Sequence, residues 1–271
     1  MIKLTSSKDS KPVFINPDFI GHLYEVPEKV IYGSVSEDAC TVVGVTTHNN
    51  GGFRVIEDDE EFCKVYDPYD YSALDYQLVW ADEFGGDTLD TDVWTHEIGG
   101  NGWGNNELQY YTNSENNSYV SEGSLFIKLI KESYEGNDYT SARLVTKGNQ
   151  DFLYGKIEMS AKLPVGKGTW PAFWMMPTAS YYGGWPDSGE IDIMEHVGYD
   201  LGNVHHSIHT EFFNHPDNTQ KGGSERHDDV DTVFHTYSLE WLPDRLIYSV
   251  DGEEIFTYDI NQFDCVKKIG R

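Results

Sequence analysis

The sequence predicts an all-β protein, a sandwich or barrel of mostly antiparallel strands. Short runs that alternate apolar and polar residues, such as 123–130 and 246–250, recur between clusters of Gly, Asn and Asp, and helical periodicity is scarce. Regularly spaced strands with such turn signals are typical of two packed sheets or of a closed barrel. A curved sandwich would also have a concave face long enough to hold a polymer.

One strand pair is explicit in the sequence. The runs 246–250 and 254–258 are separated by a turn that contains Asp251 and Gly252. A two-residue turn between strands requires positive φ angles, which an Asp-Gly pair adopts readily. We therefore expect a β-hairpin here.

The composition limits the class of partner. Of the 271 residues, 38% are hydrophobic and 14% are aromatic, including 18 Tyr and 7 Trp, which is more ring surface than a core alone needs. Stacking on sugar rings is a natural use for the surplus. The formal net charge of -27 would repel phosphate backbones and anionic membranes, so we expect neither nucleic acid nor membrane as a partner. A neutral polymer or a cation fits the charge, which is equally consistent with a plain solvated acidic surface. We expect a monomer.

The chain divides into an N-terminal segment, residues 1–74, and a larger domain, residues 75–271. The acidic run 57–61 precedes the boundary, and only the pieces 29–32 and 40–46 look like strands before it. These are too few to specify a fold. We interpret the segment as an incomplete β module of unknown role.

The three cysteines, Cys40, Cys63 and Cys265, have no metal-ligand spacing, and their odd number leaves at least one thiol unpaired. A disulfide between Cys40 and Cys63 is one option. The first residues, MIKLTSSKDSKPVF, contain no apolar run that would predict a signal peptide or a transmembrane helix.

Residues 188–198 (SGEIDIMEHVG) carry three acids in a strand-like pattern, in which Glu190 and Asp192 alternate with isoleucines, as expected for a strand with one wet face. Glu195 is out of phase with this alternation. In an unbroken strand its carboxylate would point into the core, which costs several kcal/mol. One extra residue at Met194, a β-bulge, would return Glu195 to the face of the other two acids.

Three acids on one face suit the cleavage of glycosidic bonds. Mutual repulsion is expected to raise at least one pKa, which separates an ionised carboxylate from a protonated carboxyl group. Two Glu side chains on one strand can approach to about 5 to 5.5 Å, the separation typical of glycosidases that retain the anomeric configuration. The alternative is a solvated acidic strand at the rim of a sheet.

The segment 190–195 (EIDIME) resembles the Glu-x-Asp-x-x-Glu signature of glycoside hydrolase family 16 in its bulge-containing form. Further blocks resemble the laminarinase (endo-1,3-β-glucanase) branch of that family, in the usual order: 78–84 (LVWADEF), 103–111 (WGNNELQYY), 142–148 (ARLVTKG) and 168–177 (GTWPAFWMMP). Five ordered blocks are far more specific than one short motif. The resemblance covers about residues 76–258 and identifies residues 75–271 as a glycoside hydrolase catalytic domain.

The resemblance implies a β-jelly-roll sandwich of the concanavalin A-like type, with a glycan cleft on its concave sheet. It implies retaining endo-hydrolysis of β-1,3 bonds in laminarin-type β-glucans. Glu190 matches the nucleophile, Asp192 the residue that orients and tunes it, and Glu195 the acid that later acts as the base. No cofactor is required for this chemistry. The lichenase branch lacks the residue equivalent to Met194, but activity on 1,3-1,4-β-glucan stays open.

The resemblance also implies binding residues around the acidic strand. Trp170, Trp174 and Trp185 match positions where sugar rings stack, and Arg143 and Asn101 match groups that bind hydroxyls. For Trp174 the alternative is core packing. Three further tryptophans lie on apolar strands and are assigned to the core: Trp80, Trp94 and Trp241.

The histidine-rich run 203–211 (NVHHSIHTE) reads as a strand in which His205, Ser207 and His209 share a face. A zinc site built from His205, His206, His209 and His215 is disfavoured, because the helical ligand spacing is missing. The resemblance implies instead that His209 contacts substrate beside the acids.

The resemblance also suggests a structural Ca²⁺, which many family members hold through a Glu like Glu83, backbone carbonyls and an Asp of the final strand. The sequence departs from the family at that strand, because residues 262–271 (QFDCVKKIGR) resemble none of its last segments. We therefore expect a jelly-roll that lacks its last C-terminal strands. The family implies an extracellular or periplasmic protein.

Two other functions stay open. A glycan-binding jelly-roll without catalysis would keep the tryptophans but would not need the bulged carboxylates. A β-glucan transglycosylase would use a sugar hydroxyl, in place of water, to intercept a glycosyl-enzyme intermediate.

Overall fold

The computed structural model describes residues 76–259 and five short strands that precede them: β1 Ile2–Thr5, β2 Pro12–Ile15, β3 Leu23–Tyr24, β4 Val42–Val43 and β5 Val55–Ile56. Strands β1, β2 and β3 form one antiparallel sheet, and β4 pairs with β5. The expected strand 40–46 contains β4. The expected strand 29–32 and the three cysteines lie outside the described residues.

The chain forms two compact units. One comprises Met1–Leu74, Pro243–Arg245 and Asp259–Arg271, and the other comprises Asp75–Leu242 and Leu246–Tyr258. The roles assigned to residues 1–74 and 75–271 stay predictions.

Residues 76–259 contain strands and turns but no α-helix. The strands are β6 Thr95–Glu97, β7 Gln109–Tyr111, β8 Ser118–Ser121, β9 Ser124–Ile127, β10 Ile130–Tyr134, β11 Asn137–Ser141, β12 Arg143–Val145, β13 Gly155–Ala161, β14 Ala172–Met175, β15 Glu190–His196, β16 Asn203–His209, β17 Lys221–Arg226, β18 His235–Trp241, β19 Arg245–Val250 and β20 Glu253–Asp259. In the described part of the chain, no helix has the length and apolarity needed to cross a membrane.

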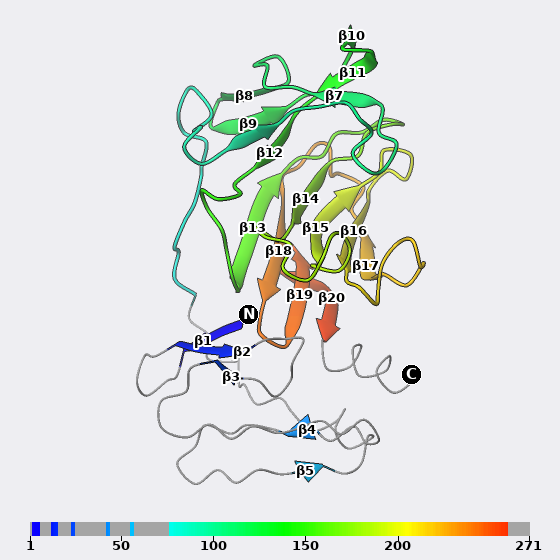
Figure 1. Ribbon diagram of the computed structural model, residues 1–271. Helices are drawn as coiled ribbons and strands as arrows, with labels where there is room; N and C mark the ends of the chain where they lie inside the picture. The colour runs from blue at the N-terminus through cyan, green and yellow to red at the C-terminus, as the bar shows by residue number, and fades with distance from the viewer. Residues whose placement is uncertain are drawn as a thin grey trace. The chain divides into compact units, whose positions relative to one another are not determined.

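Two four-stranded sheets make up the body of the larger unit, in the orders β13-β18-β19-β20 and β14-β15-β16-β17 (Figure 1). The smaller pairings of β7 to β11 gather at one end of it, at the top of Figure 1. The core lies between the two large sheets, because its buried cluster draws on both: Leu163, Met194, Val204, Val230, Tyr237 and Val250. The predicted all-β sandwich is confirmed.

The predicted hairpin is confirmed as β19 and β20. Its turn residues Asp251 and Gly252 have φ angles of 51° and 82°, the left-handed values that a two-residue turn requires. The alternating run 123–130, in contrast, is not one strand. It is split between β9 and β10, which belong to different sheets.

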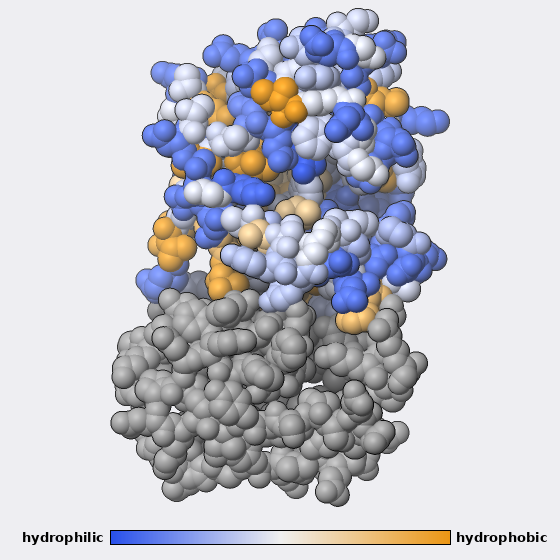
Figure 2. Space-filling view, in the orientation of Figure 1, coloured by the Kyte–Doolittle hydropathy of each residue, from blue (hydrophilic) through white to orange (hydrophobic). Residues whose placement is uncertain are grey.

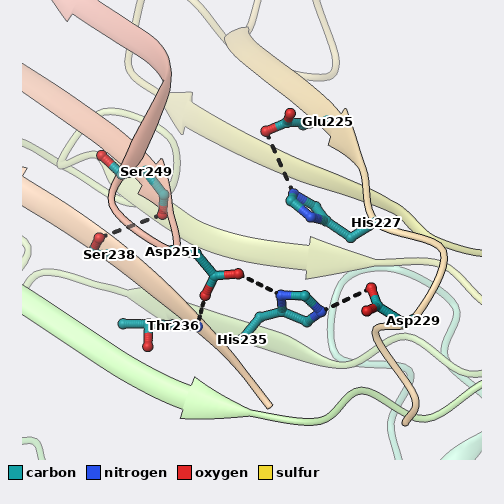
Figure 3. A network of polar contacts seen from close by, with 8 residues as sticks. All are labelled: Glu225, His227, Asp229, His235, Thr236, Ser238, Ser249 and Asp251. Atoms are coloured by element: carbon teal, nitrogen blue, oxygen red, sulfur yellow. Dashed lines mark hydrogen bonds and ion pairs between the residues drawn. The ribbon is translucent and has the colours of Figure 1, made fainter. Parts of the chain in front are cut away.

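A network of acids and histidines fastens this hairpin to the start of β18 (Figure 3). The Nδ1 atom of His235 lies 2.7 Å from Asp251, and its Nε2 atom lies 3.2 Å from Asp229. The backbone N–H of Thr236 also donates to Asp251. Burial works to raise the pKa of Asp251, but the Thr236 N–H and the His235 imidazole outweigh it and hold that pKa below its usual value. The network therefore stabilises the hairpin while Asp251 is ionised.

The face of the larger unit seen in Figure 2 is mainly hydrophilic, with apolar residues in small separate patches. The whole chain also carries a formal net charge of -27. A surface of this kind keeps like-charged molecules apart.

The close approach of β16 and β17 depends on Gly222. A Cβ atom at Gly222 would meet the backbone oxygen of His206 well inside van der Waals contact, whereas a Cβ at Gly184 would meet nothing within 4 Å. We predict that Gly222→Ala lowers the free energy of unfolding by about 1–3 kcal/mol, because the two strands must move apart. Denaturant unfolding measures this, with Gly184→Ala as the control. Equal stability of the two variants would contradict the prediction.

Candidate active site

The three predicted acids lie on β15, which contains one extra residue. Asp192 pairs with Ser207 of β16 and Glu195 pairs with His205, so three steps along β15 match two steps along β16. The register against β14 shifts in the same place, between the pairs Trp174 to Asp192 and Phe173 to Met194. The predicted bulge is confirmed. Ile193 and Met194 are both buried, and the bulge returns Glu195 to the side of the other acids.

Each outer carboxylate accepts a hydrogen bond from an indole. The Nε1–H of Trp170 donates to Glu195 at 2.9 Å, and the Nε1–H of Trp185 donates to Glu190. Both indoles remain about half exposed, at 49% for Trp170 and 45% for Trp185. The ring surfaces of Trp170 and Trp185 therefore remain accessible to a ligand, although their N–H groups bind the two glutamates.

Asp192 is buried, with only 3% of its surface exposed, so the expected wet face is wrong for this residue. Its flanking partners in the sheet are Trp174 on β14 and Ser207 on β16. The Nε2 atom of His209 also lies 3.2 Å from an Asp192 carboxylate oxygen. Trp174 and His209 on the neighbouring strands thus keep water from the Asp192 carboxyl group. Alternation along β15 alone does not reveal this burial.

Burial is the first cause of the raised carboxyl pKa values. Loss of water contact and then the charge of Asp192 raise the pKa of Glu190 to about 7, although Trp185 and His209 act in the opposite direction. Loss of water contact and then the charge of Glu195 raise the pKa of Asp192 to about 8. The predicted elevation is confirmed, but mutual repulsion is its second cause.

The titrations of Glu190 and Asp192 depend on each other, because contact between the two carboxyl groups raises the pKa of Glu190 and lowers that of Asp192. Two carboxyl groups in such contact hold one proton between them near neutral pH, so the pair carries one negative charge. When Asp192 holds that proton, Glu190 is ionised. The arrangement can therefore supply a nucleophilic carboxylate at neutral pH inside a partly dehydrated site.

His209 lies beside the inner acids. It pairs in register with Glu190, and its ring centre is 5.7 Å from that of Trp185. The alternating burial of β16 confirms that His205, Ser207 and His209 share a face. Within residues 76–259, the buried Nδ1 atom of His209 has no hydrogen-bond partner. Its contact with substrate stays a prediction.

Arg143 is held between two indoles. Its guanidinium carbon lies 4.7 Å from the ring centre of Trp103 and 4.5 Å from that of Trp174. Glu97 on β6 lies opposite Arg143 on β12 and accepts a hydrogen bond from the Nε–H of Arg143. Trp174 is thus not fully buried in the core, but its ring already packs against the Arg143 guanidinium and is not free to stack on a sugar.

Two residues of the arrangement, Trp103 and Glu97, are not among the candidates drawn from the sequence. Trp103 has a φ of 47° and its indole donates to the Gly99 carbonyl, so a strained turn fixes its ring over Arg143. Its place in the block 103–111 was the one signal available. Glu97 carries no motif, and it meets Arg143 across 46 residues only because β6 pairs with β12.

The remaining sequence candidates are Asn101 and Glu83. Asn101 and Glu83 are both exposed. Among the described residues, no group of three or more His, Cys, Asp or Glu side chains is placed to hold a metal ion. A calcium ion held by Glu83, one Asp and backbone carbonyls would not require such a group, so the calcium stays a prediction. The core assignment of Trp80, Trp94 and Trp241 fits only in part, since all three are half-buried against other aromatic rings.

Comparison with known proteins points to one family. Residues 104–267 match the family described as glycosyl hydrolases family 16. The chain is 50% identical over 190 residues to a β-glucanase of Rhodothermus marinus, a match that covers 69% of this chain and 66% of that protein. It is 43% identical over 194 residues to a glucan endo-1,3-beta-glucosidase of Cryptopygus antarcticus, covering 68% and 70% respectively. The chain thus spans about two thirds of each relative.

The fold agrees with this match. The solved structure of the laminarinase from Rhodothermus marinus superimposes with a TM-score of 0.68 at 46% identity. The match covers 69% of this chain and 76% of that one.

The raised pKa of Asp192 predicts that the folding stability decreases as the pH rises. A carboxyl whose pKa rises from 3.8 to about 8 stabilises the fold below pH 4, and this contribution is lost as the pH rises through 8. In Asp192→Asn the contribution is absent at every pH. The variant should therefore gain unfolding free energy relative to wild type between pH 4 and 8, at about 1.4 kcal/mol per pKa unit as an upper bound.

Thermal and urea unfolding across pH 4 to 8 measure this gain. Asp228→Asn is the control, since its side chain is 79% exposed. A difference between Asp192→Asn and wild type that stays constant over this range would disprove the elevated pKa.

Proposed function

Because this chain belongs to glycosyl hydrolase family 16, we propose that it hydrolyses internal β-1,3 bonds of laminarin-type β-glucans with retention of the anomeric configuration. The proposal is supported by relatives named β-glucanase and glucan endo-1,3-beta-glucosidase. The observation that carries it is the bulge in β15, which brings Glu190 and Glu195 to one face with an indole N–H on each.

In the first step, Glu195 donates a proton to the glycosidic oxygen while ionised Glu190 attacks the anomeric carbon from the opposite side. The bond between the anomeric carbon and the leaving chain breaks, and a glycosyl ester on Glu190 forms. The Glu190 charge needed for this attack is available when the proton shared with Asp192 resides on Asp192.

In the second step, Glu195 is a carboxylate and removes a proton from water. The water oxygen bonds to the anomeric carbon, and the ester bond to Glu190 breaks. Two inversions at one carbon give net retention. The hydrogen bond from the Nε1–H of Trp185 stabilises the charge that returns to Glu190.

The exposed indoles suit a polymer that extends past both acids. Trp185 is bonded to Glu190 near one end of β15, and Trp170 is bonded to Glu195 near the other. Sugar rings stacked on both would place a bond in the interior of the chain at the carboxylates. This accounts for an endo mode of attack, with Arg143 and His209 as further groups for hydroxyl binding.

Assays on laminarin and lichenan, with agarose as a third polymer, test the activity. We expect new reducing ends from laminarin with wild type, and a loss of about 10²- to 10⁴-fold in kcat for Glu195→Gln. Glu190→Gln should lose at least as much. Glu158→Gln, an exposed carboxylate on β13, serves as the control and should keep wild-type activity. Equal sugar release by wild type and Glu190→Gln would overturn the assignment.

Azide separates the two roles. With an aryl β-laminaribioside, Glu190→Ala should form the α-glycosyl azide and Glu195→Ala the β-glycosyl azide, since azide replaces a different group in each. If Glu190→Ala gave the β-glycosyl azide and Glu195→Ala the α-glycosyl azide, the two residues would have the opposite roles. NMR of the first wild-type product should show the β-anomer, and products longer than the substrate would indicate transglycosylation.

A further inference from the structure

The bulge in β15 is contacted from the core side by a histidine that the proposed mechanism does not use. The Nδ1 atom of His206 lies 2.6 Å from the backbone oxygen of Ile193. His206 is on β16, the strand next to β15, and only 1% of its surface is exposed. Ile193 lies inside the interval where the ladder between β15 and β16 is irregular.

The contact is unusual for neighbouring strands. A carbonyl in a regular ladder points along the sheet toward the next backbone, whereas a side chain stands roughly perpendicular to the sheet. The imidazole of His206 reaches the Ile193 oxygen because the bulge interrupts the ladder at this residue. It thereby satisfies a buried backbone acceptor, whose loss of a partner would cost free energy.

The chemistry of the ring is defined by this contact. A carbonyl oxygen only accepts, so the proton resides on Nδ1 of His206. Burial lowers the pKa of His206, which keeps the ring neutral. Tyr248 of the facing sheet lies against it, with ring centres 5.6 Å apart, and donates from its hydroxyl to the Ser207 carbonyl at 3.0 Å. The ring is therefore held from the other sheet as well.

We propose that His206 is a positioning residue, which holds the β15 bulge in register through the Ile193 carbonyl and so sets Glu195 in line with Glu190. This inference rests on the proposed glycosidase function of the same carboxylates. His206 contacts neither acid directly. It acts through Ile193 and Met194, the two buried bulge residues that shift the alternation of side chains between Asp192 and Glu195.

Three substitutions separate a donated hydrogen bond from simple core packing. His206→Asn keeps an N–H close to the position of Nδ1, and His206→Leu keeps apolar volume without a donor. Thr140→Val is the control, because it removes buried hydrogen bonds on β11, away from the bulge. Each variant is made in the full chain, and its melting temperature is measured first.

Kinetics on laminarin give the first readout. His206→Leu should lose at least tenfold in kcat, with KM changed less than threefold, because the cleavage geometry is altered while the sugar-binding surface is kept. His206→Asn should stay within about threefold of wild type. Thr140→Val should lower the melting temperature but keep kcat. Wild-type kcat in His206→Leu, or an equal loss in the Asn and Leu variants, would overturn the inference.

Amide hydrogen exchange gives a second readout that needs no activity. In His206→Leu the amides of residues 193–195 should exchange at least tenfold faster than in His206→Asn and in Thr140→Val. Unchanged exchange in His206→Leu would refute the role in holding the bulge. If wild type cleaves none of the polymers, the proposed function fails, while the exchange measurement still decides whether His206 holds the bulge.

Discussion

One extra residue in β15 places Glu195 on the same side of the sheet as Glu190 and Asp192, and the rest of the site depends on it. Without the bulge, strand alternation would direct the Glu195 carboxylate into the cluster that packs the two sheets together. The indole of Trp170 would then lose its partner, and the two glutamates could not carry out the proposed reaction on one sugar. The bulge is accommodated because Ile193 and Met194 fill the core beneath it.

The electrostatics of the site follow from burial of the inner acid. Asp192 lies between the side chains of two neighbouring strands, where a full charge is costly, so the pair it forms with Glu190 keeps a proton. This arrangement lowers the stability of the folded chain as the pH rises. Such a cost is expected where a fold carries acid and base chemistry, and the Trp185 N–H and His209 offset part of it.

The exposed side of the site is organised by aromatic rings with polar partners. Trp170 and Trp185 present ring surface while their N–H groups orient the carboxylates. Arg143 takes its orientation from Trp103, Trp174 and Glu97, which come from separate loops and strands. The proposed catalytic and binding groups are therefore coupled, because a shift of either indole also moves a carboxylate.

Much of this was determined by sequence alone. The Asp251-Gly252 turn is local, so it specified the hairpin, and the phase of Glu195 specified the bulge. Period-two alternation predicted an all-β chain, but it did not show that the run 123–130 is divided between β9 and β10. The sequence did not reveal that Asp192 is buried, that Glu97 pairs with Arg143, or that His206 bonds to Ile193. Each of these depends on which strands become neighbours, and long-range pairing leaves no mark on the spacing of residues within one strand. The sequence by itself therefore determined which acids share a face of the sheet. Only the tertiary structure decided how far that face is shielded from water and which contacts fix its geometry.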